Sequence, residues 1–184
     1  MARRAGGAYA IGVTADAPPL DALAVAAAIR GARTARGSLR VVGGGTWLDA
    51  GRPVHADTTL TLSSMRGVTQ YEPGDFSLTA RAGTTLGEIA DVAGREGQWL
   101  TLQPHGTIDG TIGATIATAS WGPLASAYGT PRDHLLGCEV VTGIGEIIRA
   151  GGRVVKNVAG FDLARLMTGA WGTLGVITEV TVRL

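Results

Sequence analysis

The sequence predicts an α+β protein with two lobes, a small βαβ lobe followed by a larger lobe of mostly antiparallel strands with helices. The small lobe is indicated by a weak strand at residues 9–13, a helical pattern after Pro19 and an apolar strand at 39–42. The larger lobe is indicated by segments in which apolar and polar residues alternate. We expect the lobes at about 1–66 and 67–184, together forming one domain without a separate substrate or cap domain.

The helix of the first lobe is expected to begin after Pro18 and Pro19, because proline is tolerated in the first turn of a helix. Gly37 marks its expected end. The strand at 39–42 follows, so strand, helix and strand form a small parallel βαβ unit. The apolar stripe of this helix is expected to consist of Leu20, Leu23, Ala24, Ala27 and Ala28.

Two alternating segments at 59–63 and 77–82 predict strands that each bury one face. Thr85 and Glu88 have the spacing of a capping box and predict the start of a second helix. Strands on either side of the glycine turn at 143–145 predict a hairpin. The remaining expected elements are a strand end at 99–104, a short helix at 161–167 with Phe161 and Leu166 in the core, and a last strand at 176–184.

The composition favours a folded protein and excludes several classes of function. Hydrophobic residues make up 45% and charged residues 17% of the 184 residues, a balance that argues against disorder. The net charge of +1 predicts no broad basic surface for nucleic acid. Cys138 is the single cysteine, so we expect a buried thiol and neither an internal disulfide nor a metal site. No apolar run reaches the ~18 residues of a membrane span. We therefore expect a cytoplasmic protein, or one held at a membrane through partner subunits.

Three consecutive glycines follow the strand at 39–42 and form the first candidate site. Glycine bares its backbone N–H group and adopts positive φ without strain, so Gly43, Gly44 and Gly45 can curve into a nest for a phosphate. Their place at the carboxyl end of a strand favours a ligand site. The stretch matches neither common phosphate-loop motif, so a plain turn in a chain with 29 glycines is the alternative.

Residues 106–118 consist mainly of Gly, Thr, Ala and Ile, and form a second candidate site. Threonine hydroxyls stand among small residues there, and Gly110 and Gly113 allow a close approach of the backbone. Such a segment can lie against a flat ligand, or it can pack tightly against a sheet. The residues alone leave both alternatives open.

Four stretches in order resemble the FAD-binding domain of the vanillyl-alcohol oxidase / p-cresol methylhydroxylase (PCMH-type) flavoproteins. They are Val-Gly-Gly-Gly-Thr at 42–46, Thr-Ile-Gly-Ala-Thr-Ile-Ala-Thr at 111–118, Tyr-Gly-Thr-Pro-Arg-Asp at 128–133, and Val-Lys-Asn-Val-Ala-Gly-Phe-Asp-Leu at 155–163 running on to Gly-Thr-Leu-Gly-Val-Ile-Thr-Glu at 172–179. The last stretch is most similar to FAD-binding subunits of bacterial glycolate oxidase and related D-2-hydroxyacid dehydrogenases. The resemblance covers nearly the whole chain after residue 20.

The resemblance implies that the chain is a flavoprotein with a nucleotide-binding site. The glycine loop would hold the FAD pyrophosphate, the stretches at 103–104 and 111–118 would run past the flavin and phosphates, and residues 175–177 would face the adenine or ribitol side. Lys156, Gly160 and Asp162 would shape the flavin end. The implied cofactor-binding residues are Val42, Gly43, Gly44, Gly45, Thr46, Trp47, Gln103, Pro104, Thr111, Ile112, Gly113, Thr115, Thr118, Lys156, Gly160, Asp162, Gly175 and Ile177.

The chain departs from the family pattern at a few positions. Val41 and Val42 stand where members often have Pro-Arg, and Ala114 stands where many have a second glycine. Thr46 occupies the place where some members carry a histidine that links FAD covalently, so non-covalent FAD is expected. Family enzymes also continue into a cap domain that supplies substrate-binding residues, and we expect that domain to be absent here.

Other polar residues have structural explanations beside the functional ones. Arg132 and Asp133 fit a loop-bracing ion pair better than a catalytic role. Asp162 can cap the helix at 163 or brace the flavin end, and His105 can contact flavin or lie in the loop. Trp171 fits packing better than electron transfer. No catalytic residue can be assigned from the sequence.

The resemblance implies an FAD-dependent oxidoreductase domain or subunit that oxidises a small 2-hydroxyacid of the glycolate or D-lactate type. Partner subunits would provide substrate binding or electron transfer. The alternative is a non-catalytic flavin-binding module, or a truncated protein, that needs a partner chain for turnover.

Overall fold

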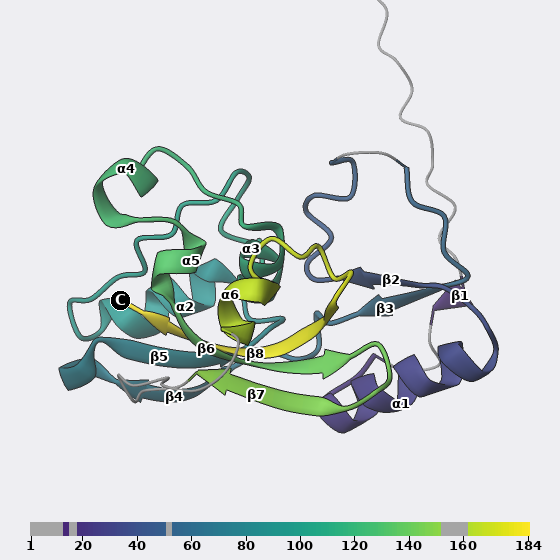
Figure 1. Cartoon of the computed structure of the whole chain (residues 1–184). Helices are drawn as coiled ribbons and strands as arrows, with labels where there is room; N and C mark the ends of the chain where they lie inside the picture. Colours follow the sequence, from purple (N-terminus) through teal and green to yellow (C-terminus); the bar gives the residue numbers. More distant parts are fainter. Residues whose placement is uncertain (1–12, 15–17, 51–52, 152–161) are drawn as a thin grey trace, which may run out of the picture.

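The computed structural model describes residues 13–14, 18–50, 53–151 and 162–184. They form two sheets with helices, which confirms the predicted α+β class (Figure 1). The small sheet is parallel with strand order β1-β3-β2, and the large sheet is antiparallel with order β4-β5-β8-β6-β7. The strands are β1 (Val13–Thr14), β2 (Leu39–Val42), β3 (Thr58–Thr61), β4 (Val68–Glu72), β5 (Ser77–Arg81), β6 (Leu135–Thr142), β7 (Ile147–Gly151) and β8 (Gly175–Arg183).

The first helix, α1 (Ala22–Thr34), connects β1 to β2 as the βαβ prediction requires. Asp21 caps it, because its carboxylate accepts a hydrogen bond from the Ala24 N–H at 2.8 Å. β3 lies between β1 and β2 and pairs in parallel with both. β2 is therefore an edge strand, and the glycines leave its carboxyl end at the margin of the small sheet.

The buried face of α1 differs from the predicted stripe. Leu23 is 68% exposed, whereas Val25 and Ile29 are buried. The helix packs against β3 and also against the turn end of β6 and β7, and this double contact turns the β-branched side chains inward. Arg30 fixes the rotation through a hydrogen bond from Nη1 to the Gly145 carbonyl at 2.8 Å.

Most of the remaining helices lie over one face of the large sheet (Figure 1). They are α2 (Leu86–Gly94), α3 (Ile112–Thr118), α5 (Pro131–His134) and α6 (Leu163–Met167), while α4 (Ala125–Tyr128) stands further out and a 3-10 turn, η1 (Pro73–Asp75), joins β4 to β5. The predicted hairpin and the capping box of Thr85 and Glu88 are both confirmed. A continuous cluster of buried apolar side chains extends from the large sheet and its helices to α1 and β3.

Several elements differ from the prediction. Residues 99–104 form no strand: Leu102 is buried, but Trp99 is 49% exposed and no neighbouring strand among the described residues pairs with the segment. Residues 112–118 form a helix whose small side chains allow it to lie close to β5 and β8. Leu166 is 55% exposed, since α6 buries Ala164 and Met167 instead, and Phe161 lies outside the described residues. Within the described ranges, no helix has the length and apolarity that crossing a membrane requires.

Candidate functional site

The loop of residues 43–47, here called the glycine loop, follows β2, and within it only Trp47 makes a main-chain hydrogen bond among the described residues, accepting from the Ala50 N–H at 3.3 Å. The Val42 carbonyl before it accepts a hydrogen bond from the Leu62 N–H at 2.7 Å, which anchors the end of the strand. Gly45 has a φ of 71°, a conformation that glycine adopts without strain. Between described residues, no hydrogen bond engages the main chain of 43–46. These N–H groups are therefore available to a ligand.

The glycine loop packs closely on the segment that precedes α3. A β-carbon on Gly43 would overlap the Thr111 hydroxyl, and one on Gly44 would come within 3.0 Å of the Asp109 carbonyl. A side chain at either position would therefore press on the segment before α3, whether or not a ligand is bound. The loop and the segment 107–111 together form the two sides of one cradle.

The start of α2 holds the segment 107–111 in place. The Leu86 N–H donates to the Gly110 carbonyl and the Gly87 N–H donates to the Ile108 carbonyl, each at 2.9 Å. The wall of the cradle is thus attached to the core of the large lobe, whereas the glycine loop belongs to the small lobe.

Thr111 carries a hydroxyl that has no hydrogen-bond partner among the described residues. It occupies the N-cap position of α3, yet its side chain makes no capping hydrogen bond. Its Oγ1 atom is buried and unpaired, a state that it shares with Ser77 Oγ among the described residues. An unsatisfied buried hydroxyl costs about 1–3 kcal/mol, so Thr111 Oγ1 is suited to a hydrogen bond with a ligand group that reaches the glycine loop.

The other predicted residues of α3 have structural partners. Ile112 is fully buried. A β-carbon on Gly113 would come within 2.6 Å of the Ala82 side chain, so this glycine lets the helix approach β5. The Thr115 hydroxyl donates to the Thr111 carbonyl at 3.1 Å, and the Thr118 hydroxyl donates to the Ala114 carbonyl at 2.7 Å. Tight packing, one of the two alternatives for this segment, is therefore part of its role.

Aromatic side chains gather beside the glycine loop. The indole rings of Trp47 and Trp171 stack with centroids 5.9 Å apart and an interplanar angle of 15°. The centroid of the His105 ring lies 5.7 Å from that of the Trp47 ring. Trp171 comes from the connection between α6 and β8, so residues from three parts of the chain meet at this point.

The segment before the cradle wall is exposed and held by few contacts. Gln103 is exposed and Pro104 is half-buried. The Gln103 carbonyl lies against Gly122, where a β-carbon would overlap it. The His105 N–H donates to Ser120 Oγ at 3.1 Å. This segment therefore reaches the aromatic group next to the glycine loop through His105.

The remaining predicted site residues lie elsewhere or outside the described residues. Gly175 and Ile177 are buried in β8, paired with β6. Asp162 caps α6, accepting from the Arg165 N–H at 3.0 Å, and forms an ion pair with the same residue at 3.0 Å. The capping alternative for Asp162 is thus present in the structure. Lys156 and Gly160 lie outside the described residues.

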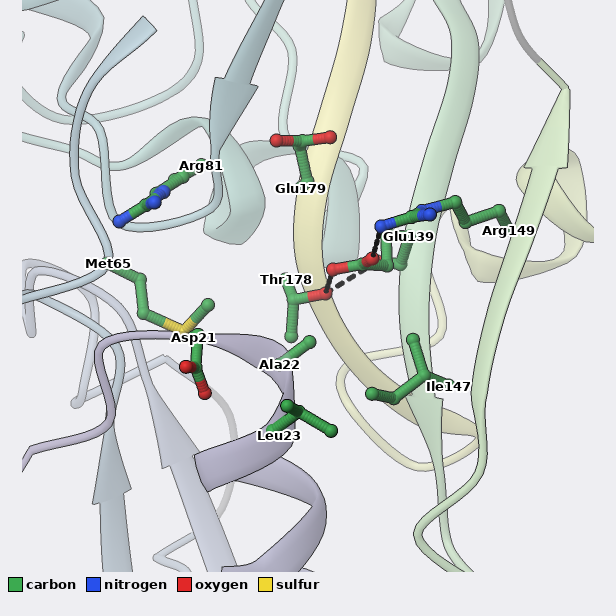
Figure 2. Close-up of a pocket in the computed structure, with 10 residues that line it drawn as sticks. All are labelled: Asp21, Ala22, Leu23, Met65, Arg81, Glu139, Ile147, Arg149, Thr178 and Glu179. Carbon is green, nitrogen blue, oxygen red and sulfur yellow. Dashed lines mark hydrogen bonds and ion pairs between the residues drawn. The ribbon is translucent and has the colours of Figure 1, made fainter. Parts of the chain in front are cut away.

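A pocket of about 460 Å³ lies where the start of α1 meets the large sheet (Figure 2). Charged side chains dominate its lining, but they are paired within the protein. Glu139 accepts from the Thr178 hydroxyl at 2.8 Å and forms an ion pair with Arg149 at 2.6 Å. Glu179 accepts from the Thr69 hydroxyl at 2.9 Å. These partners make the pocket a satisfied ionic surface, and none of the predicted cofactor residues lines it.

No described ionisable group stands out as a catalytic acid or base. Asp133 does not brace Arg132 as expected, because its carboxylate accepts hydrogen bonds from the Thr130 N–H and hydroxyl. These bonds lower the pKa of Asp133. Cys138 is buried as predicted, and this burial raises the pKa of its thiol to about 11. The described residues contain no cluster of three or more metal-ligating side chains that could hold a metal ion.

A family model described as FAD binding domain matches residues 15–151. The chain belongs to this family. The FAD-binding domain is 42% identical over 135 residues to the glycolate oxidase subunit GlcE of Escherichia coli, covering 73% of this chain and 38% of the relative. It is 38% identical over 144 residues to a D-lactate dehydrogenase of Archaeoglobus fulgidus, covering 77% of this chain and 32% of the relative. The chain thus spans about a third of the length of these relatives.

Solved structures show the same fold. An alkyldihydroxyacetonephosphate synthase matches with a TM-score of 0.76 at 21% identity, over 90% of this chain and 30% of that one. A variant of Phl p 4, described as a glucose oxidase, matches with a TM-score of 0.73 at 18% identity, over 90% and 34%. The expected PCMH-type fold and the family resemblance are therefore confirmed.

FAD is the cofactor of this family, and the cradle fits it. The free N–H groups of the glycine loop and the unpartnered Thr111 hydroxyl are all hydrogen-bond donors, and a pyrophosphate offers only acceptors at neutral pH. The sequence missed Trp171 and Asp109 as neighbours of the loop. Nothing in their local sequence identifies them, because both reach the loop through the packing of distant segments.

Proposed function

We propose that the chain is the FAD-binding domain or subunit of an oxidoreductase that acts on a small 2-hydroxyacid such as glycolate or D-lactate. Support for the reaction comes from the relatives named as a glycolate oxidase subunit and a D-lactate dehydrogenase. The observation that carries FAD binding at the glycine loop is the buried Thr111 hydroxyl, which lies against Gly43 and has no partner in the described part of the chain.

The chain's own residues would bind and orient FAD, which supplies the acceptor for a hydride or electrons when bound. The glycine loop and Thr111 would hold its pyrophosphate through neutral N–H and O–H donors. Thr46 provides no imidazole for a covalent link, in agreement with non-covalent binding. As part of the proposal, Lys156, Gly160 and Asp162 would shape the flavin end, and residues 175–177 would face the adenine or ribitol side.

Partner chains or further domains would complete the enzyme. The matched region accounts for 38% of the GlcE relative and 32% of the dehydrogenase, so substrate binding and electron transfer are assigned to parts beyond it. We describe the present chain as lobes at about 1–66 and 67–184 of one FAD-binding domain. The same coverage favours a second candidate, a flavin-binding module that has no turnover of its own.

The visible spectrum of the chain purified with FAD tests these proposals. A yellow protein whose flavin absorbance is bleached by glycolate or D-lactate supports the oxidoreductase. A yellow protein that stays oxidised with both acids supports the module, and a colourless folded protein contradicts both.

A matched pair of variants tests the location of FAD. Gly44→Val places a side chain against the Asp109 carbonyl and is expected to remove bound FAD. Gly143→Val is the control, because a β-carbon at Gly143 has no neighbour within 4 Å. Retention of FAD by the Gly44 variant would contradict binding at the glycine loop.

A further inference from the structure

The stacked pair of Trp47 and Trp171, here called the indole pair, joins the two sides of the cofactor site. Trp47 is the last residue of the glycine loop, and Trp171 lies in the connection between α6 and β8. Their centroid distance of 5.9 Å and their angle of 15° are those of an offset-stacked aromatic pair. The small-lobe loop is thus in direct contact with the large lobe through two side chains.

Trp171 is held by the backbone, unlike the loop that it contacts. Its N–H donates to the Ala117 carbonyl at 2.8 Å, and the Gly169 N–H donates to the Ile116 carbonyl at 3.1 Å. These bonds attach the connection to the last turn of α3. Residues 43–46 have no such main-chain bonds between described residues, so Trp171 is a fixed surface for a loosely held loop.

The conformation of Trp171 indicates that its side chain has a use outside the core. Its φ is 52°, in the left-handed region that bulky residues rarely adopt. The residue is 54% exposed, so burial does not account for a tryptophan here. Glycine would adopt the same backbone conformation without strain, and strain retained at one residue points to a functional constraint.

We propose that Trp171 is a positioning residue for the FAD site, whose stack on Trp47 holds the glycine loop in the conformation that accepts the cofactor phosphates. This inference rests on FAD binding at the glycine loop as proposed above. A loop that is ordered before binding loses less conformational entropy when the cofactor arrives, so pre-organisation increases affinity. The indole pair lies beside the cradle and needs no contact of its own with FAD.

Substitutions at Trp171 separate this role from a purely structural one. Trp171→Gly removes the ring and relieves the left-handed strain, while Trp171→Phe keeps a ring that can stack. The FAD dissociation constant is measured by the fluorescence of released FAD, and the stability of the FAD-free chain is measured by urea unfolding. Trp121→Gly is the control, because this tryptophan is 63% exposed and lies outside the indole pair.

Trp171→Gly is expected to raise the FAD dissociation constant about three- to tenfold, with an unfolding midpoint that stays the same or rises. Trp171→Phe is expected to bind FAD within about twofold of the wild-type affinity, because the phenyl ring keeps most of the stacking with Trp47. If Trp171→Gly lowered the urea unfolding midpoint in parallel with the affinity for FAD, Trp171 would have a structural role only and the inference would be overturned. Unchanged affinity in that variant would also overturn it.

A double-mutant cycle tests whether the two indoles act as a pair. Trp47→Ala and Trp171→Ala are expected to weaken FAD binding by similar factors, and the double variant is expected to be no weaker than the worse single variant. Effects that multiply in the double variant would contradict the pair. A wild-type chain that binds no FAD would contradict FAD binding itself, which distinguishes that failure from failure of the indole pair.

Discussion

The Thr111 hydroxyl occupies the space that a β-carbon on Gly43 would need. This contact brings a loop of the small lobe against the last residue of the cradle wall in the large lobe. The same hydroxyl is buried without a hydrogen-bond partner. We expect this contact to contribute both to the packing of the fold and to the proposed cofactor site. Substitutions of Gly43 and of Thr111 should separate the two effects.

Gly43→Ala is expected to disrupt the cradle from the loop side. The new methyl group overlaps Thr111 Oγ1 and also lies within 3.2 Å of the Ala114 β-carbon, so either the loop or the Thr111 side chain must shift. Overpacking of this kind costs about 1–3 kcal/mol of folding stability. A loss of similar size in the binding free energy would lower FAD affinity by about tenfold or more. Urea unfolding and an FAD titration measure the two quantities.

Gly31→Ala is the matched control for that substitution. Gly31 lies within α1, and a β-carbon there has no neighbour within 4 Å. Alanine in a helix interior is favoured over glycine by about 0.5–1 kcal/mol, so this variant should be more stable with unchanged FAD affinity. Equal FAD affinity in the Gly43 and Gly31 variants would show that the contact with Thr111 does not shape the site.

Thr111→Val is expected to change stability and affinity in opposite directions. Valine keeps the branched shape but removes the unpaired hydroxyl, so the FAD-free chain should gain about 1 kcal/mol. No capping energy is lost, because the Thr111 side chain makes no capping bond. FAD binding should weaken about tenfold, which corresponds to one hydrogen bond of roughly 1.4 kcal/mol.

Thr111→Ser provides the comparison because it retains the hydroxyl and removes only a methyl group. Its FAD affinity should stay near that of the wild type while its stability falls by about 1 kcal/mol, the cost of one buried methyl group. Undiminished FAD binding by Thr111→Val would remove this hydroxyl from the proposed site.

Local patterns were enough to predict the elements that depend on neighbours in sequence. The capping box at Thr85 and Glu88, the hairpin at 143–145 and the strand before the glycine loop are confirmed because their signals lie within a few residues. The buried face of α1 was predicted wrongly, since two sheets far apart in sequence determine it. β4 was missed because it is an edge strand whose side chains are largely exposed.

The candidate site was predictable as residues but not as contacts. The three glycines identify a possible nest, and their order with later motifs indicates FAD. The sequence does not show that Gly113 lies against Ala82 for packing, because that requires the position of α3 on the sheet. The stack of Trp47 on Trp171 joins residues 124 positions apart in the sequence, and no local pattern reports such a contact.

Glu88 is expected to stabilise the wall of the cradle in a pH-dependent manner. Its carboxylate accepts a hydrogen bond from the Thr85 N–H at 2.8 Å and forms an ion pair with Arg66 at 3.0 Å. Partial burial raises its pKa, but the bonds from Thr85 and Arg66 outweigh burial and lower the pKa below the usual 4.5. Glu88→Ala should cost about 1 kcal/mol of stability at neutral pH, as the loss of a helix cap does.

The sign of the pH effect follows from that lowered pKa. Ionised Glu88 is favoured in the folded chain, so its contribution is fully present above the unfolded pKa of about 4.5 and is lost as the pH falls through the lower folded value. Glu88→Gln keeps a capping-box side chain but cannot ionise, so its stability should fall less steeply than that of the wild type below pH 4.5. The stabilities of Glu88→Gln and of the wild type are measured by urea unfolding at several pH values. If both fell equally steeply below pH 4.5, the role of this carboxylate would be contradicted.

Cys138 is expected to resist alkylation in the folded chain. The side chain is buried in β6, and burial raises the pKa of its thiol from 9.0 to about 11, so at pH 8 both access and the thiolate form are lacking. Iodoacetamide should label it only in unfolded protein, as followed by mass spectrometry with and without urea.

Because the folded pKa is the higher one, this thiol's contribution to stability is fully present below about pH 9 and is lost as the pH rises towards 11. Cys138→Ala should therefore lose less stability than the wild type across that interval, and rapid labelling at pH 8 without urea would contradict the buried position.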